Sequence, residues 1–201
     1  MKVVLFCGGL GTRMREHSET MPKPLVTVGD RPILWLLMKY YAHFGHKDFI
    51  VCLGYKGEMI KDFFLNYNPY LHQNFSIERG GKIHPETSDI ADWRITFVDT
   101  GMHSNIGERL VKVRPYLEGE KVFLANYSDQ LTDLSLPAHI EACSQRDVIA
   151  GFVAVRPSQS FHCISFDNEG MVEGIQPVRE SDMCVIHGAK LGHANGGYCP
   201  A

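Results

Sequence analysis

The chain has no apolar run long enough to cross a membrane, which takes about 20 consecutive apolar residues. The apolar run at its start is short and gives way to Gly8-Gly9. A secretory leader has a longer apolar region that ends in small residues at a cleavage site. We therefore expect a cytoplasmic protein without a leader or a membrane span.

An excess of positive charge is also missing, because 20 Lys and Arg face 23 Asp and Glu, for a formal net charge of −3. Nucleic-acid binding and polybasic membrane attachment are therefore not expected. Any phosphate must be bound by a few placed cations and by backbone N–H groups.

The C-x-x-C motif is absent too, since none of the six cysteines has this spacing to another. This argues against a zinc ribbon. We expect reduced thiols, as in a cytoplasm. There are no internal repeats or low-complexity segments. With 201 residues, 44% of them apolar, the chain is predicted to form a single domain over residues 1–201.

Short apolar runs alternate with helical periodicity along most of the chain. Strands are predicted at Lys2–Cys7, Asp48–Leu53, Trp93–Val98, Val122–Asn126 and Val148–Val155, with a weak strand at Phe75–Ile77 and a hairpin of Cys163–Phe166 with Met171–Ile175. Helices are predicted from Arg31 to Phe44, and at Met59–Tyr67, Ile106–Tyr116 and Pro137–Cys143. This order indicates a parallel sheet with right-handed crossovers.

The last 20 residues, 182–201, show little periodicity and several glycines. No closing helix or strand is predicted there. We therefore interpret residues 182–201 as an atypical tail, the least ordered part of a domain that is truncated at its C-terminus.

The loop after the first strand, Gly8-Gly9-Leu10-Gly11-Thr12-Arg13, has the composition of a phosphate-binding turn. Its glycines permit positive φ and close approach to a ligand, and successive N–H groups form an anion-binding concavity. Arg13 adds a planar charged fork. Farther on, Pro22 and Pro24 are expected to hold Lys23 in extended backbone. The loop matches neither G-x-G-x-x-G nor a Walker A motif, and a purely structural turn is the alternative.

Taken together, GGLGTR and PKP resemble the signature of the sugar-phosphate nucleotidylyltransferases. The segments RPILW, DFIVCLGYKG, FVDTG and GERL are similar to the glucose-1-phosphate cytidylyltransferase branch, and the likeness extends from Met1 to about Ser181. It implies a three-layer α/β/α domain with a mostly parallel, Rossmann-like sheet. It also implies an enzyme that joins a sugar 1-phosphate, glucose 1-phosphate first, to a nucleotide, CTP first, with release of pyrophosphate.

The resemblance also implies site residues and Mg²⁺ as the cofactor. These are catalytic Arg13 and Lys23; nucleotide-binding Gly8, Gly9, Gly11, Thr12, Gly107 and Arg109; sugar-phosphate-binding Arg179 and Asn195; and the magnesium ligand Asp129. Gly107 and Arg109 lie in the stretch that reads the base in the family. A solvated helix charge is the alternative for Arg109. A turn or helix-cap aspartate is the alternative for Asp129.

Some positions depart from the family pattern. Gln130 stands where relatives carry glycine, and Gln176-Pro177-Val178-Arg179 replaces a Glu-Lys-Pro motif, so Arg179 is the substitute sugar-phosphate contact. Asn195 comes later than in relatives, which also supply a second metal aspartate farther on. Two alternatives therefore stay open: a relative that uses another base or sugar, and an inactive or truncated module that binds nucleotide sugars. A homo-oligomer is a further possibility.

Overall fold

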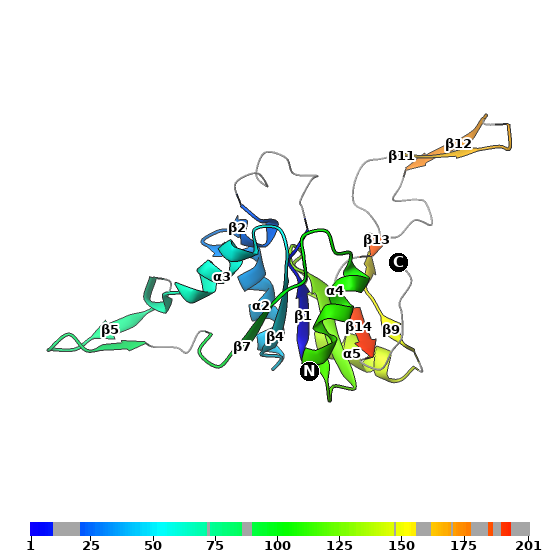
Figure 1. The fold of residues 1–201 in the computed structure, drawn as a ribbon. Helices are drawn as coiled ribbons and strands as arrows, with labels where there is room; N and C mark the ends of the chain where they lie inside the picture. Colours follow the sequence, from blue (N-terminus) through cyan, green and yellow to red (C-terminus); the bar gives the residue numbers. More distant parts are fainter. Residues whose placement is uncertain are drawn as a thin grey trace.

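A six-stranded sheet in the order β7-β4-β1-β8-β14-β9 forms the centre of the computed structural model (Figure 1). The model describes residues 1–9, 21–71, 73–85, 90–146, 148–155, 162–169, 171–177, 185–186 and 190–193. The strands of this sheet are β1 Val3–Phe6, β4 Asp48–Leu53, β7 Arg94–Asp99, β8 Val122–Tyr127, β9 Ala150–Gly151 and β14 Lys190–His193. Strands β7, β4, β1 and β8 pair in parallel, and β14 runs antiparallel to both β8 and β9. The predicted mostly parallel sheet is confirmed.

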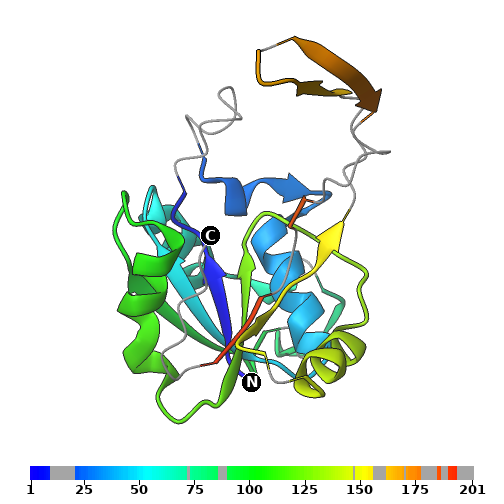
Figure 2. The same cartoon turned by 90° about the vertical axis from the view of Figure 1, so that its right-hand side faces the viewer.

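Helices cover both faces of the sheet, as Figure 2 shows with α4 on one side and α2 and α5 on the other. Helices α2 (Ile33–His43), α3 (Gly57–Leu65) and α5 (Leu136–Ser144) share one apolar core with the sheet. Helix α4 (Ile106–Val113) and the 3₁₀ turn η3 (Arg114–Leu117) share the other. The predicted three-layer α/β/α architecture is therefore confirmed.

Strand β1 shows why this sequence forms a central strand. Its side chains alternate between the two cores, Val3 and Leu5 on the α2 side, Val4 and Phe6 on the α4 side, and all are buried. Parallel strands covered on both faces are continuous apolar runs for this reason. Burying each such side chain fully contributes about 1.5–3 kcal/mol, so β1 anchors the residues that follow it.

In two places the structure replaces or divides a predicted element, and elsewhere boundaries shift by at most three residues. Arg31–Pro32 does not open a helix but forms a short strand, β3, paired with β2 (Thr27–Val28), and the helix begins at Ile33. Pro32 itself has extended backbone, with φ −59° and ψ 143°. The predicted strand Val148–Val155 is divided into β9 and β10 (Ala154–Val155).

Two hairpins project from the body of the molecule (Figure 1). One consists of β5 (Phe75–Ile77) and β6 (Ile83–Pro85). The other consists of β11 (His162–Phe166) and β12 (Val172–Pro177). The second is the predicted hairpin of Cys163–Phe166 with Met171–Ile175, whereas only a weak strand was predicted at the first, at Phe75–Ile77. A 3₁₀ turn, η2 (Pro69–Leu71), precedes the first.

The expectation that no closing strand follows residue 181 is wrong. Strand β13 (Val185–Ile186) pairs with β10, and β14 is a member of the central sheet between β8 and β9. Strand β14 has only four residues and contains Gly192, so alternation gives little signal there. Its place depends on pairing with residues far away in the sequence.

Within the described residues, none of the helices has the length and apolar character needed to span a membrane.

Candidate functional site

A cavity of about 400 Å³ opens at the carboxyl ends of β1 and β8. The chain passes from β1 outward to β4 and β7, and α4 then brings it back to β8 on the other side of β1. The strand order therefore reverses between β1 and β8. Ligands of open α/β sheets bind at such reversals, and the cavity has the size of a small-molecule site.

Segments far apart in the sequence line this cavity. They contribute Phe6, Cys7, Gly8, Gly9, Lys23, Pro24, Met102, His103, Ser104, Asn105, Ile106, Arg109, Tyr127, Ser128 and Asp129. Five predicted site residues are thus brought together: Gly8, Gly9, Lys23, Arg109 and Asp129. Gly107 lies in the first turn of α4 and is not among the lining residues. The other predicted residues, Gly11, Thr12, Arg13, Arg179 and Asn195, lie outside the described part of the chain.

Lys23 reaches the cavity from a 3₁₀ turn, η1 (Lys23–Leu25), and not from extended backbone as predicted. The Leu25 N–H donates to Pro22 O at 2.9 Å, and the Val26 N–H donates to Lys23 O at 3.0 Å. Pro22 and Pro24 are buried. The fixed φ of proline suits a 3₁₀ turn as well as extended backbone. The two proline rings therefore restrict the backbone on both sides of Lys23, but in a conformation other than the predicted one.

Arg109 is buried, with 4% of its surface exposed, so the alternative of a solvated helix charge is wrong. Its guanidinium donates to Thr100 Oγ1 at 2.5 Å, to Leu53 O and Gly8 O at 3.0 Å each, and to Met102 O at 3.5 Å. Burial lowers the pKa of Arg109, but a guanidinium stays protonated in proteins. These acceptors are neutral oxygens, so they leave a positive charge beside the cavity.

The Arg109 side chain leaves room only for glycine at position 8. A Cβ on Gly8 would lie 2.0 Å from Arg109 Nη1, whereas a Cβ on Gly9 would meet nothing within 4 Å. Neither residue has a positive φ, so the expectation of left-handed backbone is wrong for these two. A Cβ on Gly54, which follows β4, would lie 2.7 Å from Gly8 O and 2.8 Å from Gly8 Cα. The strand ends are therefore packed backbone against backbone.

The loop before α4, residues 102–105, forms one wall of the cavity. The sequence did not predict this contribution. Asn105 caps the helix with a reciprocal capping box, in which its side chain accepts from Glu108 N at 2.9 Å and its own N–H donates to Glu108 Oε2 at 2.8 Å. Lys112 Nζ donates to Thr100 O at 2.8 Å and to Ser104 Oγ at 3.0 Å. The Asn-x-x-Glu spacing is the signal that could have located this wall.

The floor of the cavity offers no activated nucleophile among its described cysteine and serine side chains. Burial raises the pKa of the Cys7 thiol, so this group is protonated at neutral pH and is not a reactive thiolate. Ser128 Oγ donates to Phe6 O at 2.8 Å and is buried. Cys7 and Ser128 therefore shape the floor of the cavity.

Asp129 is the residue that could hold a metal. It is exposed and follows β8 at the edge of the cavity. Among the described residues there is no group of three or more His, Cys, Asp and Glu side chains that could hold a metal alone. Magnesium, however, is commonly bound by one or two carboxylates together with substrate phosphates. Asp129 therefore fits a magnesium ion that arrives with a phosphate ligand.

These features define an α/β protein with a cavity at the point where its strand order reverses. The family model for nucleotidyl transferases matches residues 2–177. The chain belongs to this family and is a nucleotidyltransferase enzyme. The family and the fold class inferred from the sequence are thereby confirmed.

Curated relatives refine the comparison. The chain is 37% identical over 192 residues to a glucose-1-phosphate cytidylyltransferase of Salmonella typhimurium, covering 94% of this chain and 73% of that protein. It is 34% identical over 203 residues to a probable glucose-1-phosphate cytidylyltransferase of Bacillus subtilis, covering 98% of this chain and 73% of that protein.

Solved structures agree on the fold. HddC from Yersinia pseudotuberculosis complexed with GMP-PN superposes with a TM-score of 0.64 at 22% identity, covering 96% of this chain and 76% of that one. A UDP-glucose pyrophosphorylase complexed with UDP-glucose superposes with a TM-score of 0.63 at 14% identity, covering 96% and 75%.

Proposed function

We propose that this protein transfers the cytidylyl group of CTP to glucose 1-phosphate, giving CDP-glucose and pyrophosphate. The observation that carries the proposal is the cavity at the sheet reversal, which unites Lys23, the Gly8-Gly9 backbone and Asp129 from separate parts of the chain. Identities of 34–37% over most of the chain to glucose-1-phosphate cytidylyltransferases support the choice of substrates.

The reaction requires positioning and charge neutralisation more than proton transfer. A phosphate oxygen of the sugar phosphate, already ionised at neutral pH, attacks the α-phosphorus of CTP. A new P–O bond forms, the bond between the α-phosphorus and the bridging oxygen breaks, and pyrophosphate leaves with that electron pair. Catalysis of phosphoryl-group transfer by placed cations fits this requirement.

The roles follow from position. Lys23, Gly8 and Gly9 line the same cavity. We assign to the Lys23 ammonium the neutralisation of charge on the reacting phosphates, and to the Gly8-Gly9 N–H groups the binding of phosphate oxygens. Asp129 would hold Mg²⁺, which supplies charge neutralisation on the triphosphate when bound. Arg13 on the triphosphate, and Arg179 and Asn195 on the sugar phosphate, remain proposals from the family resemblance.

We place the reaction in the cytoplasm, in a pathway of nucleotide-sugar and polysaccharide synthesis. The described cysteines Cys7, Cys52 and Cys143 are free thiols, as is usual in a reducing compartment. A homo-oligomer remains a prediction that light scattering on the purified chain would test.

Pyrophosphate release tests the proposal directly. The purified chain is incubated with Mg²⁺, glucose 1-phosphate and CTP, UTP, GTP or dTTP in separate reactions. We expect fastest release with CTP, and no release when glucose 1-phosphate is omitted. Faster release with another nucleotide would favour a relative with a different base. Nucleotide binding without any release would favour the inactive module.

A further inference from the structure

Three neighbouring strand ends meet around one buried cation at the carboxyl edge of the sheet. Arg109 comes from α4, on the face opposite α2, and its side chain reaches the ends of β1, β4 and β7. It bonds Gly8 O after β1, Leu53 O at the end of β4, and Thr100 Oγ1 after β7. The Thr100 hydroxyl in turn donates to Leu53 O at 2.7 Å. The guanidinium is thus the common partner of three segments.

The donor inventory of Arg109 limits what else it can bind. A guanidinium has five N–H groups, two on each terminal nitrogen and one on Nε. Nη1 donates to Leu53 O and Thr100 Oγ1, and Nη2 donates to Gly8 O and, at a longer 3.5 Å, to Met102 O. Reading a base edge with an arginine usually takes two parallel donors. Both terminal nitrogens are already engaged with the protein.

The bond to Gly8 O has a consequence for the next residue. The C=O of Gly8 and the N–H of Gly9 belong to the same planar trans peptide, so they point in opposite directions. Arg109 draws Gly8 O toward the protein interior, and the Gly9 N–H must then face away from the guanidinium. Gly8 is buried, whereas Gly9 is exposed, and both line the cavity.

We propose that Arg109 is a positioning residue that fixes the Gly8–Gly9 peptide so that the Gly9 N–H is presented to a phosphate group, and that it does not read the base. This inference rests on the proposed function for the identity of the nucleotide. Arg109 acts on this peptide in two ways. Its hydrogen bond to Gly8 O sets the direction of the Gly9 N–H, and its positive charge on one side of the peptide favours an anion on the other side.

The first test separates phosphate positioning from base reading. Dissociation constants of CTP and of cytidine, which lacks phosphates, are measured for the wild type and Arg109→Lys, whose point charge cannot form the same fork. We expect CTP affinity to fall by at least about tenfold, since hydrogen bonds to charged groups are the strong ones. Cytidine affinity and the preference for CTP over UTP should stay unchanged. An equal loss for cytidine, or no loss for CTP, would overturn the proposal.

A second variant reaches the same peptide without removing the arginine. Gly8→Ala places a Cβ 2.0 Å from Arg109 Nη1 and must displace the guanidinium. It should reproduce the selective loss of CTP affinity. The matched control for Arg109→Lys is Arg114→Lys, the same substitution at an exposed arginine that directly follows α4 and does not line the cavity. Its CTP affinity should stay within about twofold of wild type, since exposed charged contacts contribute little.

A ligand-free measurement separates this inference from the proposed function. The Gly9 amide resonance is followed by NMR in the nucleotide-free wild type, Arg109→Lys and Arg114→Lys. We expect its position to change in Arg109→Lys only. An unchanged Gly9 resonance would overturn the inference even if the enzyme releases pyrophosphate. A Gly9 resonance that changes in Arg109→Lys, together with a wild type that binds no CTP, would refute the proposed function and leave the Arg109–Gly8 contact established.

Discussion

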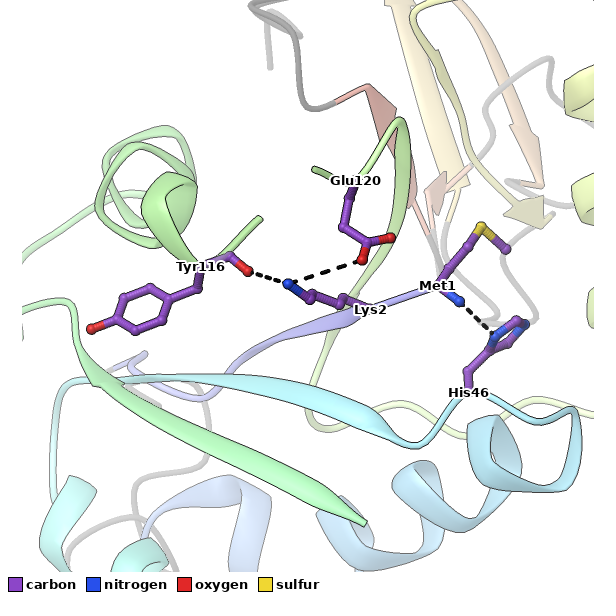
Figure 3. A network of polar contacts seen from close by, with 5 residues as sticks. All are labelled: Met1, Lys2, His46, Tyr116 and Glu120. Carbon is purple, nitrogen blue, oxygen red and sulfur yellow. Dashed lines mark hydrogen bonds and ion pairs between the residues drawn. The ribbon is translucent and has the colours of Figure 1, made fainter. Parts of the chain in front are cut away.

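The two ends of strand β1 each have a cation that ties the strand to its neighbours, but in opposite surroundings. At the amino end, Lys2 Nζ donates to Tyr116 O at 2.8 Å and lies 3.9 Å from a Glu120 carboxylate oxygen (Figure 3). The Met1 amino group lies 3.4 Å from His46 Nδ1 in the same network. At the carboxyl end, the cation is Arg109, buried under Gly8.

The difference shows where this fold tolerates change. The Lys2–Glu120 pair is partly exposed and 3.9 Å long. Surface ion pairs contribute only about 0–1 kcal/mol, because water competes and side-chain freedom is lost. The carboxyl end does not tolerate larger residues at two positions, because there is no room for a Cβ on Gly8 or on Gly54. One strand thus has a permissive end and a constrained end, and the cavity lies at the constrained one.

The largest expected effect is on turnover and follows from Lys23. Lys23→Ala should lower turnover by at least about a hundredfold, the scale of losing one charge-stabilising contact in a transition state. Steady-state pyrophosphate release measures it. Lys2→Ala, which removes a cation from the other end of β1, is the control and should keep wild-type turnover. Similar turnover in the two variants would remove Lys23 from the reaction.

The next effect concerns the metal. Asp129→Asn should raise the magnesium concentration for half-maximal activity by at least about tenfold, the loss that even outer-shell partners of a metal cause. The change keeps the side chain's size, so circular dichroism should report an unchanged fold. A magnesium titration that matches wild type would make Asp129 a structural turn residue, the alternative left open by the sequence.

A third prediction concerns stability at the constrained end. Gly54→Ala should lower the free energy of unfolding by about 1–3 kcal/mol, the usual cost of overpacking, because its Cβ would press on the Gly8 backbone. Urea unfolding measures the change. Gly9→Ala is the matched variant for this measurement, since its Cβ meets nothing within 4 Å. Equal stabilities would show that the strand ends are looser than described.

The smallest expected effect is on the pH dependence of stability and comes from His46, at the amino end of β1. Burial and the adjacent Met1 amino group lower the pKa of His46. The unfolded chain therefore binds this proton more readily, and stability should fall slightly as the pH drops through about 6.5, the usual histidine value. Urea unfolding of the wild type and His46→Gln between pH 5 and pH 8 measures the difference. A loss of stability of the same size in His46→Gln would assign the effect to other groups.

The sequence predicted the parallel strands and covering helices well, because each has its own local pattern. Strand β4 (Asp48–Leu53) was located to the residue, because Phe49–Leu53 is an uninterrupted apolar run. Local patterns failed where structure depends on distant partners. Strand β14 is defined by pairing with β8 and β9, and the 3₁₀ turn at Lys23 also fits a Pro-Lys-Pro sequence that suggested extended backbone.

The same limit applies to the candidate site. Motifs predicted that Gly8, Lys23 and Asp129 share a site, and the structure brings all three to one cavity. The burial of Arg109 was not foreseen, because a helical arginine has the same sequence pattern whether it is solvated or buried. Its acceptors come from three strand ends that only the tertiary fold brings together.

The most direct test of the account is a CTP titration of the isotope-labelled protein followed by amide NMR in the presence of Mg²⁺. The account predicts that shifts concentrate at the constrained end, at Gly8, Gly9, Asn105 and Asp129. Resonances of Lys2 and His46 should stay in place. Shifts centred on Lys2 and His46, or no saturable shift around Gly8, would contradict the location of the nucleotide site.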